Sequence, residues 1–460
     1  MRELHPMTAL GLSIAVLGRQ GWVLAKACLV RAAIVALFLY SSPMFAQNVL
    51  QNLGRNDLPN GPTTIDTGSL PYTIRSGDFR LLVSPSIEAD WNDNINGASS
   101  GRQQDFIFQP SLQLTGTYPI TAHNILNISL GIGYAEYLEH PIYNGLRISA
   151  GSQVAFDVYI KDFKFDFHDS ASESQDTGAQ GGVAGTAFFG GLVNTFGVTG
   201  TWNLHDLVLT LGIDQNNYFA SSSLFDYLNY SSENPVARAN FQFRPNFSAG
   251  LETSASFTSY SQEVLNNSQN YSAGVLATWN PDEFFIVTAH AGYAIYDYGQ
   301  TSQSGQIFEE SPTGGTNVVP VGGAIRTANQ SSWYAMFALT HRITERIDYN
   351  LSFNEQIVPG VQSDASKVTS VILAGNWAFS KALSFHSTID YDHGQQGEGN
   401  ISGNLSETYN FVNATLSANY AITKAMALAL SYRRALRYSS LAGASYGQDL
   451  VSLTLSYRFL

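Results

Sequence analysis

Apolar and polar residues alternate along most of the chain from Asp78 onward, and this period of two is the feature that most constrains the fold. The last eleven residues read LVSLTLSYRFL, in which Val451, Leu453 and Leu455 alternate with serine and threonine. Successive side chains of a β-strand point to opposite faces, so the pattern predicts strands with one apolar face. That face either packs on the core of a soluble sandwich or contacts lipid.

Short turns and long polar segments alternate between the predicted strands. A self-similar element recurs along the chain: an aromatic residue, two to four turn residues, then renewed alternation. Successive members lie about 40 residues apart, apart from one longer interval, and four of them lie near Ile120, Leu204, Pro281 and Thr423. Eight short turns and nine longer segments predict 18 strands, with both chain ends on the short-turn side. Bacterial outer-membrane barrels have short periplasmic turns and long outward loops. We therefore predict an all-β fold, a transmembrane antiparallel up-and-down β-barrel of about 18 strands, with short periplasmic turns and long extracellular loops.

Aromatic residues are sorted to the strand ends on the apolar face. Those beside the short turns are Tyr118, Trp202, Trp279, Trp377, Tyr420 and Phe459. A second set, which includes Trp91 and Trp333, lies near the long segments. Such aromatic girdles are typical of the two interfaces of a membrane. A soluble sandwich gives no reason for this sorting, so we favour contact with lipid.

The membrane also requires the sheet to close. In hydrocarbon every backbone N–H and C=O must be paired within the protein, and an open sheet edge leaves such groups unpaired. We expect the last strand, which ends near Phe459, to pair with the first strand, which begins at Phe79. The terminal aromatic is similar to the C-terminal signature that outer-membrane proteins present to the barrel-assembly machinery, although Leu460 follows it.

The N-terminal residues predict export. Lys26 and Arg31 precede an apolar run from Ala32 to Tyr40, and the small residues near Ala46 are typical of a signal-peptidase site. The run is too short to span a bilayer, which takes roughly 20 apolar residues. We predict a secretory signal peptide at residues 1–46, a flexible periplasmic leader at 47–77 and the β-barrel at 78–460.

Composition and charge narrow the partners. Only 13% of the residues are charged, against roughly 25% in an average soluble domain. The single cysteine, Cys28, lies in the predicted signal peptide, so we expect no disulfide in the mature chain. Without residues 1–46, which hold four basic residues and one acid, the chain has 19 Lys+Arg, 35 Asp+Glu and a formal net charge of −16. Such a charge argues against nucleic acid as a partner.

Three short motifs between Phe79 and Pro141 carry a resemblance to a known family. They are Asp93-Asn94-Ile95, Asp105-Phe106-Ile107, and the turn Pro119-Ile120-Thr121 that leads to Tyr134 and Tyr137. The stretch resembles the start of the beta-barrel porin family of the second type. The resemblance implies an outer-membrane barrel without catalytic residues. Some related barrels belong to exopolysaccharide gene clusters, which supplies an alternative role.

Charged residues on the polar parity are candidates for lining a lumen. The basic ones on the first and last strands, which closure makes neighbours, are Arg80, Arg433, Arg437 and Arg458. Acids on the same parity elsewhere round the ring include Asp157, Asp166, Asp214, Glu252 and Asp390. A basic strip opposed by carboxylates would set a field across a pore. The alternative is that these charges pair locally or are solvated.

The longest loop, residues 298–330, has two open interpretations. Its Gly-rich stretches could fold into the lumen and narrow it, with Glu309, Glu310 and Arg326 as constriction charges. It could equally remain a mobile surface loop. The acidic total suggests a mild cation preference for the pore, weakened by screening of the loop charges.

We find no constellation for an enzyme, a metal or a cofactor. His386 precedes Asp390 by four residues on one predicted strand, a separation of about 13 Å that is too long for a hydrogen bond. No Cys/His spacing suggests zinc. The sequence favours a Gram-negative outer-membrane porin that lets small hydrophilic solutes, such as sugars or ions, diffuse through a water-filled channel.

Two alternatives stay open: an exopolysaccharide export barrel and, less favoured, an outer-membrane hydrolase. The expected partners are outer-membrane lipid and lipopolysaccharide, the barrel-assembly machinery and small polar solutes. A homo-oligomer is also open.

Overall fold

The computed structural model describes residues 70–121, 123–174, 176, 178, 181–187, 189–299, 301–310, 316–325, 328–361, 363–396 and 406–459, with the backbone alone for 301–310 and 316–325. The predicted signal peptide and most of the predicted leader lie outside these residues. Among the described residues, no helix has the length and apolarity to cross a membrane.

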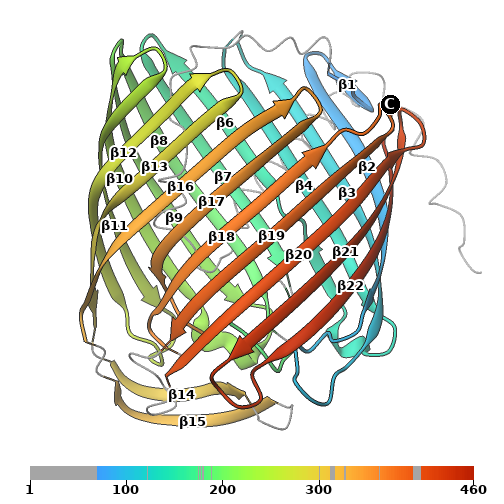
Figure 1. Ribbon diagram of the computed structural model, residues 1–460, viewed down its shortest axis with the longest axis vertical. Coiled ribbons are helices and arrows are strands. Elements are labelled where there is room, and N and C mark those ends of the chain that lie inside the picture. The colour runs from blue at the N-terminus through green and yellow to red at the C-terminus, as the bar shows by residue number, and fades with distance from the viewer. Residues whose placement is uncertain are drawn as a thin grey trace, which may run out of the picture. The chain divides into compact units, whose positions relative to one another are not determined.

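One antiparallel sheet closes on itself into a barrel (Figure 1). Its first half contains β2 (Phe79–Asn92), β3 (Asp105–Pro119), β4 (Ile125–Tyr137), β5 (Gly145–Ile148), β6 (Ser152–Ile160), β7 (Phe163–Ser174), β8 (Gly191–Leu204), β9 (Leu207–Ala220), β10 (Tyr230–Arg244) and β11 (Phe247–Tyr260). Its second half contains β12 (Ser268–Asp282), β13 (Phe285–Tyr298), β16 (Gln330–Thr344), β17 (Ile347–Val358), β18 (Ser366–Trp377), β19 (Leu383–Gln396), β20 (Glu407–Ala421), β21 (Met426–Ser439) and β22 (Tyr446–Tyr457).

Within the described part of the chain the ring has 18 strands, because β5 and β6 both pair with β4 and are two pieces of one strand. The predicted fold class is therefore confirmed. The break between the two pieces, at residues 149–151, was not predicted. There Ser152 Oγ accepts a hydrogen bond from the Gly131 N–H across the gap (2.9 Å).

The barrel closes where β22 pairs with β2, from Ser86 opposite Ser456 to Asn92 opposite Leu450. Beyond the end of β22, the Phe459 N–H still donates to the Val83 carbonyl (3.1 Å). The remaining edge of β2 is covered by β1 (Ile74–Ser76), which turns back through Gly77 at φ +62° and pairs with Phe79–Leu81. The last residues of the predicted leader thus complete the seam at the short-turn rim.

The two faces of the sheet differ as the alternation predicts. On β11, the side chain of Leu251 is 65% exposed on the outer face, whereas that of the next residue, Glu252, is 3% exposed in the interior. Since a transmembrane barrel faces lipid with one parity and its lumen with the other, this arrangement suits a bilayer on the outside.

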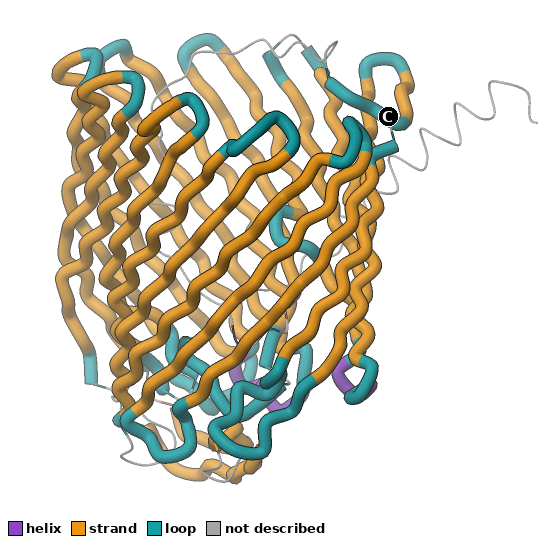
Figure 2. Tube along the Cα trace, turned by 45° about the vertical axis from the view of Figure 1, so that its right-hand side comes forward, coloured by secondary structure: helices purple, strands orange, loops and turns teal. Residues whose placement is uncertain are grey.

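Turns and loops segregate to opposite ends. The short turns lie at the top of Figure 1 and the long loops at the bottom, where Figure 2 shows loops and short helical turns gathered within the barrel end. These include η2 (Pro141–Tyr143) and η4 (Ser223–Leu228). The longest loop contains a separate hairpin, β14 (Thr301–Glu310) with β15 (Thr316–Ile325), which was not predicted. We refer to the two ends as the turn end and the loop end.

An arginine on the outer face tests its contact with lipid. We expect Leu430→Arg, at an exposed outer position of β21, to lower the free energy of unfolding by about 2–4 kcal/mol, because lipid solvates the guanidinium poorly. The neighbouring change Ser431→Arg places the same side chain in the lumen and should cost less than half as much. Urea titration in lipid vesicles measures both. Equal losses would contradict a lipid-facing outer surface.

Candidate functional site

The lumen wall carries a first network of charged side chains on β6, β7 and β9. Lys164 Nζ lies 2.9 Å from Asp157 Oδ1. His168 bridges two carboxylates, with Nδ1 at 2.7 Å from Asp166 and Nε2 at 3.2 Å from Asp214. The wall charges at this place are therefore paired with one another across strands.

A glycine makes that bridge possible. His168 and Asp214 lie on strands that are separated by β8, and the β8 residue between them is Gly197. A Cβ at Gly197 would lie 2.1 Å from Asp214 Oδ1, far inside van der Waals contact. The absence of a side chain thus lets the two groups meet over the intervening strand.

A second network centres on Glu252 of β11. Its Oε1 accepts a hydrogen bond from the Tyr334 hydroxyl (3.0 Å), and its Oε2 lies 2.9 Å from His290 Nδ1 and 3.8 Å from Arg238 Nε. All four side chains are nine-tenths buried or more. Burying a carboxylate is costly unless it is paired and hydrogen-bonded, so this cluster has the partners that its burial requires.

Tyr334 reaches Glu252 by lying flat across two strands. It belongs to β16, and β13 and β12 separate it from β11. The residues beneath it are Gly292 and Gly274, where a Cβ would lie 2.5 Å from the ring and 2.2 Å from the hydroxyl. These two glycines form a groove in the wall for the tyrosine ring.

A small-residue stretch between β7 and β8 is inserted into the lumen. Its described residues are 176, 178, 181–187 and 189–190, and we call the part from Asp176 to Ala187 the inserted segment. Ala184 packs with Phe411 and Tyr446 of β20 and β22, and Ala187 packs with Ile95 of the β2–β3 loop. The segment therefore starts on one side of the ring and contacts strands far round it.

Two arginines of β21 hold the inserted segment. Arg433 Nη2 donates to Asp176 Oδ1 (2.9 Å) and to Gln448 Oε1 (3.0 Å). Arg437 Nε donates to the Gly181 carbonyl (2.8 Å) and Nη1 to the Ala444 carbonyl (2.6 Å).

The surroundings of Arg437 bury it completely. Its guanidinium lies 2.6 Å from Glu407 Oε1 and 5.0 Å from the centre of the Tyr409 ring. Its side chain is 0% exposed. This charge therefore fastens the segment to the wall rather than facing open solvent.

Glycines allow the segment to approach the wall closely. A Cβ at Gly181 would lie 2.9 Å from Phe411, and one at Gly178 would overlap Gln448. Gly185, at φ +77°, donates from its N–H to the Gly97 carbonyl (3.0 Å). The composition of the segment thus matches its place against the barrel wall.

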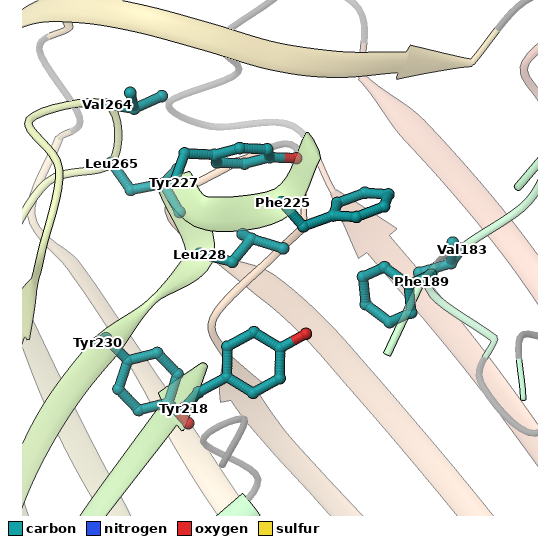
Figure 3. Packing of buried hydrophobic residues seen from close by; sticks show 9 residues of the cluster. All are labelled: Val183, Phe189, Tyr218, Phe225, Tyr227, Leu228, Tyr230, Val264 and Leu265. Carbon is teal, nitrogen blue, oxygen red and sulfur yellow. The ribbon is translucent and has the colours of Figure 1, made fainter. Parts of the chain in front are cut away.

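An apolar cluster closes part of the loop end. Phe225, Tyr227 and Leu228 of η4 pack against Val264 and Leu265 of the β11–β12 loop (Figure 3). Phe189 from the end of the β7–β8 loop meets Phe225 edge-on, with ring centres 5.1 Å apart. The loops are thus joined into a cap over the lumen.

Polar bonds tie the same cap to the β17–β18 loop. The Tyr227 hydroxyl donates to the Val361 carbonyl (3.0 Å). Asn266 donates from its N–H and Nδ2 to the two oxygens of Asp364, both at 2.8 Å.

The predicted site residues are distributed as follows. Arg80, Arg433 and Arg437 lie on the lumen side, whereas Arg458 is exposed at the turn end. The structure brings together Asp157, Asp166 and Asp214 in the first network and places Glu252 in the second. Asp390 lies apart from both, on β19, and accepts from Ser370 Oγ (3.4 Å). Their effect on ion selectivity stays a prediction.

The predicted aromatic girdle beside the turns lies on the outer face of the barrel. The six aromatics beside the turns are all exposed on the outer face: Tyr118, Trp202, Trp279, Trp377, Tyr420 and Phe459.

Glu309 and Glu310 of the predicted constriction fall in β14, whose side chains lie outside the described residues, as does Arg326. Figure 1 shows the β14–β15 hairpin across the loop end. A constriction by these three charges stays a prediction.

The inserted segment is the element that sequence reasoning missed. Its composition is nevertheless distinctive: the sequence from Thr177 to Gly191 holds many glycines and alanines and only a few polar residues. A solvent-exposed loop has no need of such small side chains, whereas a segment packed against a wall does.

Comparison with known proteins finds similar solved structures at low sequence identity. A scan of family models and a search of curated proteins find no match. Among solved structures, OpdL of Pseudomonas aeruginosa is 12% identical with a TM-score of 0.41, over 83% of this chain and 99% of that chain. OccK2 (OpdF) of the same organism, in complex with glucuronate, is 10% identical with a TM-score of 0.42, over 83% and 98%.

A third solved structure is a loop L8 deletion mutant of OmpT, an outer membrane protein of Vibrio cholerae. It is 9% identical with a TM-score of 0.38, over 83% of this chain and 99% of that chain.

The bond between Tyr334 and Glu252 makes a testable contribution to stability. Tyr334→Phe should lower the free energy of unfolding by about 1.5–3 kcal/mol, because a buried carboxylate loses a donor. Tyr293→Phe is the matched control, because the Tyr293 hydroxyl donates to Ser331 Oγ on the exposed outer face. This change should lower the free energy of unfolding by less than about 0.5 kcal/mol. Urea titration in vesicles measures both, and equal effects would refute the role of the bond.

The Arg437 anchor gives a second stability test. Arg437→Met leaves Glu407 buried without its cation and should cost about 3–5 kcal/mol, whereas Arg437→Met with Glu407→Gln should recover much of that loss. Limited proteolysis should cut the inserted segment faster in the single variant than in the native protein. Unchanged cleavage would show that Arg437 does not hold the segment.

Proposed function

We propose that this protein is an outer-membrane channel through which small hydrophilic solutes diffuse passively. The observation that carries the proposal is a closed barrel, apolar outside, whose lumen is lined by polar and ion-paired side chains and narrowed by the inserted segment. Eighteen strands enclose more space than their own side chains fill. A segment fixed across that space sets the width of the path and so the size of solute that passes.

The geometry also indicates what the channel would select. The acids of both networks have partners, so at these two places the wall offers local dipoles and hydrogen-bonding groups more than free charge. Polar solutes would exchange water for these groups as they pass. The lumen histidines His168 and His290 bond to carboxylates. These bonds have a structural role in the wall and do not imply catalysis. We therefore propose a non-enzymatic role.

Single-channel recording in a planar lipid bilayer tests the proposal. The native protein should give discrete conductance steps in potassium chloride. Deletion of residues 176–187 should raise the step at least twofold, because the inserted segment occupies the cross-section that limits current. A protein that folds in vesicles but never conducts, with or without the segment, would refute the channel.

The matched control removes the β14–β15 hairpin, residues 302–324, which lies across the loop end. We expect this deletion to raise the conductance step less than the deletion of the inserted segment does. A larger rise would instead support constriction by Glu309 and Glu310, the two predicted constriction charges that the deletion removes. The exopolysaccharide export barrel would give a silent pore and co-purify with a periplasmic partner, and a hydrolase would release product from lipid or peptide.

A further inference from the structure

A small cavity opens on the lumen wall below the loop cap, between β11, β12, β13 and the start of the β17–β18 loop. Ser256 of β11, Asn270 of β12 and Tyr296 of β13 are register neighbours along one row of the sheet. Ala294 lies at its floor among Tyr296 and Tyr334. Ala294 is a small residue between two large rings, so a larger side chain at this position would reduce the cavity.

The hydrogen-bonding groups around the cavity are almost all uncharged. Ser256 and Thr258 each lie 3.0 Å from the Ser232 hydroxyl, and Ser272 lies 2.6 Å from the Ser254 hydroxyl. The carboxylate in the lining, Asp364, accepts from Asn266 with both oxygens. An anionic solute would therefore find no positive counter-charge among these groups, whereas a hydroxyl finds both donors and acceptors.

One acceptor in the lining is not used by the protein. Asn270 is 7% exposed, and its side chain hydrogen-bonds Tyr296, whereas its Oδ1 has no hydrogen-bond partner among the described residues. A buried amide oxygen left unpaired is costly. Gln356, 8% exposed on β17, presents a second amide to the same space.

Size and shape limit what can enter. The cavity has a volume of about 40 Å³, and one water occupies about 10–15 Å³ on this measure, so it receives about three water-sized groups. That is the size of a hydroxyl-bearing edge of a sugar or of a short polyol, not of a whole sugar. The rings of Tyr296 and Tyr334 supply apolar surface for the carbon atoms beside those hydroxyls.

We propose that this cavity is a subsite for neutral polyhydroxylated solutes, which it binds by two neighbouring hydroxyls with Asn270 Oδ1 as an acceptor. The proposal rests on the lumen being a path for solutes. It identifies the substrate class as sugars and polyols rather than anions. Ethers of similar size lack the donors that Asn270 needs, and a site built to bond hydroxyls discriminates strongly against molecules without them.

Saturation-transfer NMR on the detergent-folded protein tests the subsite without requiring conduction. The probes are glucose, triethylene glycol as an ether of similar size, and gluconate as an anion. The native protein should transfer saturation to glucose at least fivefold more than to triethylene glycol or gluconate. Asn270→Leu should raise the dissociation constant for glucose about tenfold, and Ala294→Leu, which fills the cavity, should abolish binding.

Asn413→Leu is the matched control, because Asn413 Oδ1 on β20 is also buried without a partner but lies outside the cavity. This variant should bind glucose with a dissociation constant within twofold of that of the native protein. Heat-shifted mobility on gels verifies that each variant is folded. Equal signals from glucose and triethylene glycol, or equal glucose affinities in the native and Ala294→Leu proteins, would overturn the subsite.

The conductance of the native protein separates the two proposals. Conduction of potassium chloride without glucose binding would refute the subsite and leave the channel standing. Glucose binding that depends on Asn270 and Ala294 in a protein that never conducts would refute the channel and leave the subsite.

Discussion

Backbone hydrogen bonding in hydrocarbon is the constraint on which the rest of the structure depends. A spanning strand has no water to satisfy its N–H and C=O groups, so each strand needs a neighbour on both sides and the sheet has to form a ring. Here the ring is completed by β22 against β2, and β1 covers the part of β2 that β22 does not reach. The outer alternation, the girdle and the segregation of turns from loops are all consequences of a ring set in a slab of lipid.

Closure creates a second problem, which is a wide interior. The protein fills it in two ways. Side chains such as Tyr334 and His168 lie across neighbouring strands over glycines, so that buried charges find partners two or three strands away. The inserted segment and the loop cap then occupy space that no wall residue could reach. Both solutions use residues without side chains to bring polar groups close together.

The sequence predicts the ring well and its interior poorly, for a physical reason. Alternation is a local property, so it predicts the strands, the eight turns, the seam near Phe459 and which parity of each strand carries Glu252 or Asp214. The partners of those residues depend on strand tilt and on gaps at Gly197, Gly274 and Gly292, which no local pattern contains. The division of β5 from β6 and the β14–β15 hairpin were not predicted either.

The inserted segment does more than obstruct. It leaves the wall at β7 and is fastened to β21 by Arg433 and Arg437 on another part of the ring. A hollow cylinder embedded in a bilayer is squeezed by the lateral pressure of the lipid chains and is softest toward flattening into an ellipse. A segment that is bonded to two separated parts of the barrel wall resists that deformation. The cross-section of the barrel should therefore stay round as the membrane around it changes thickness or tension.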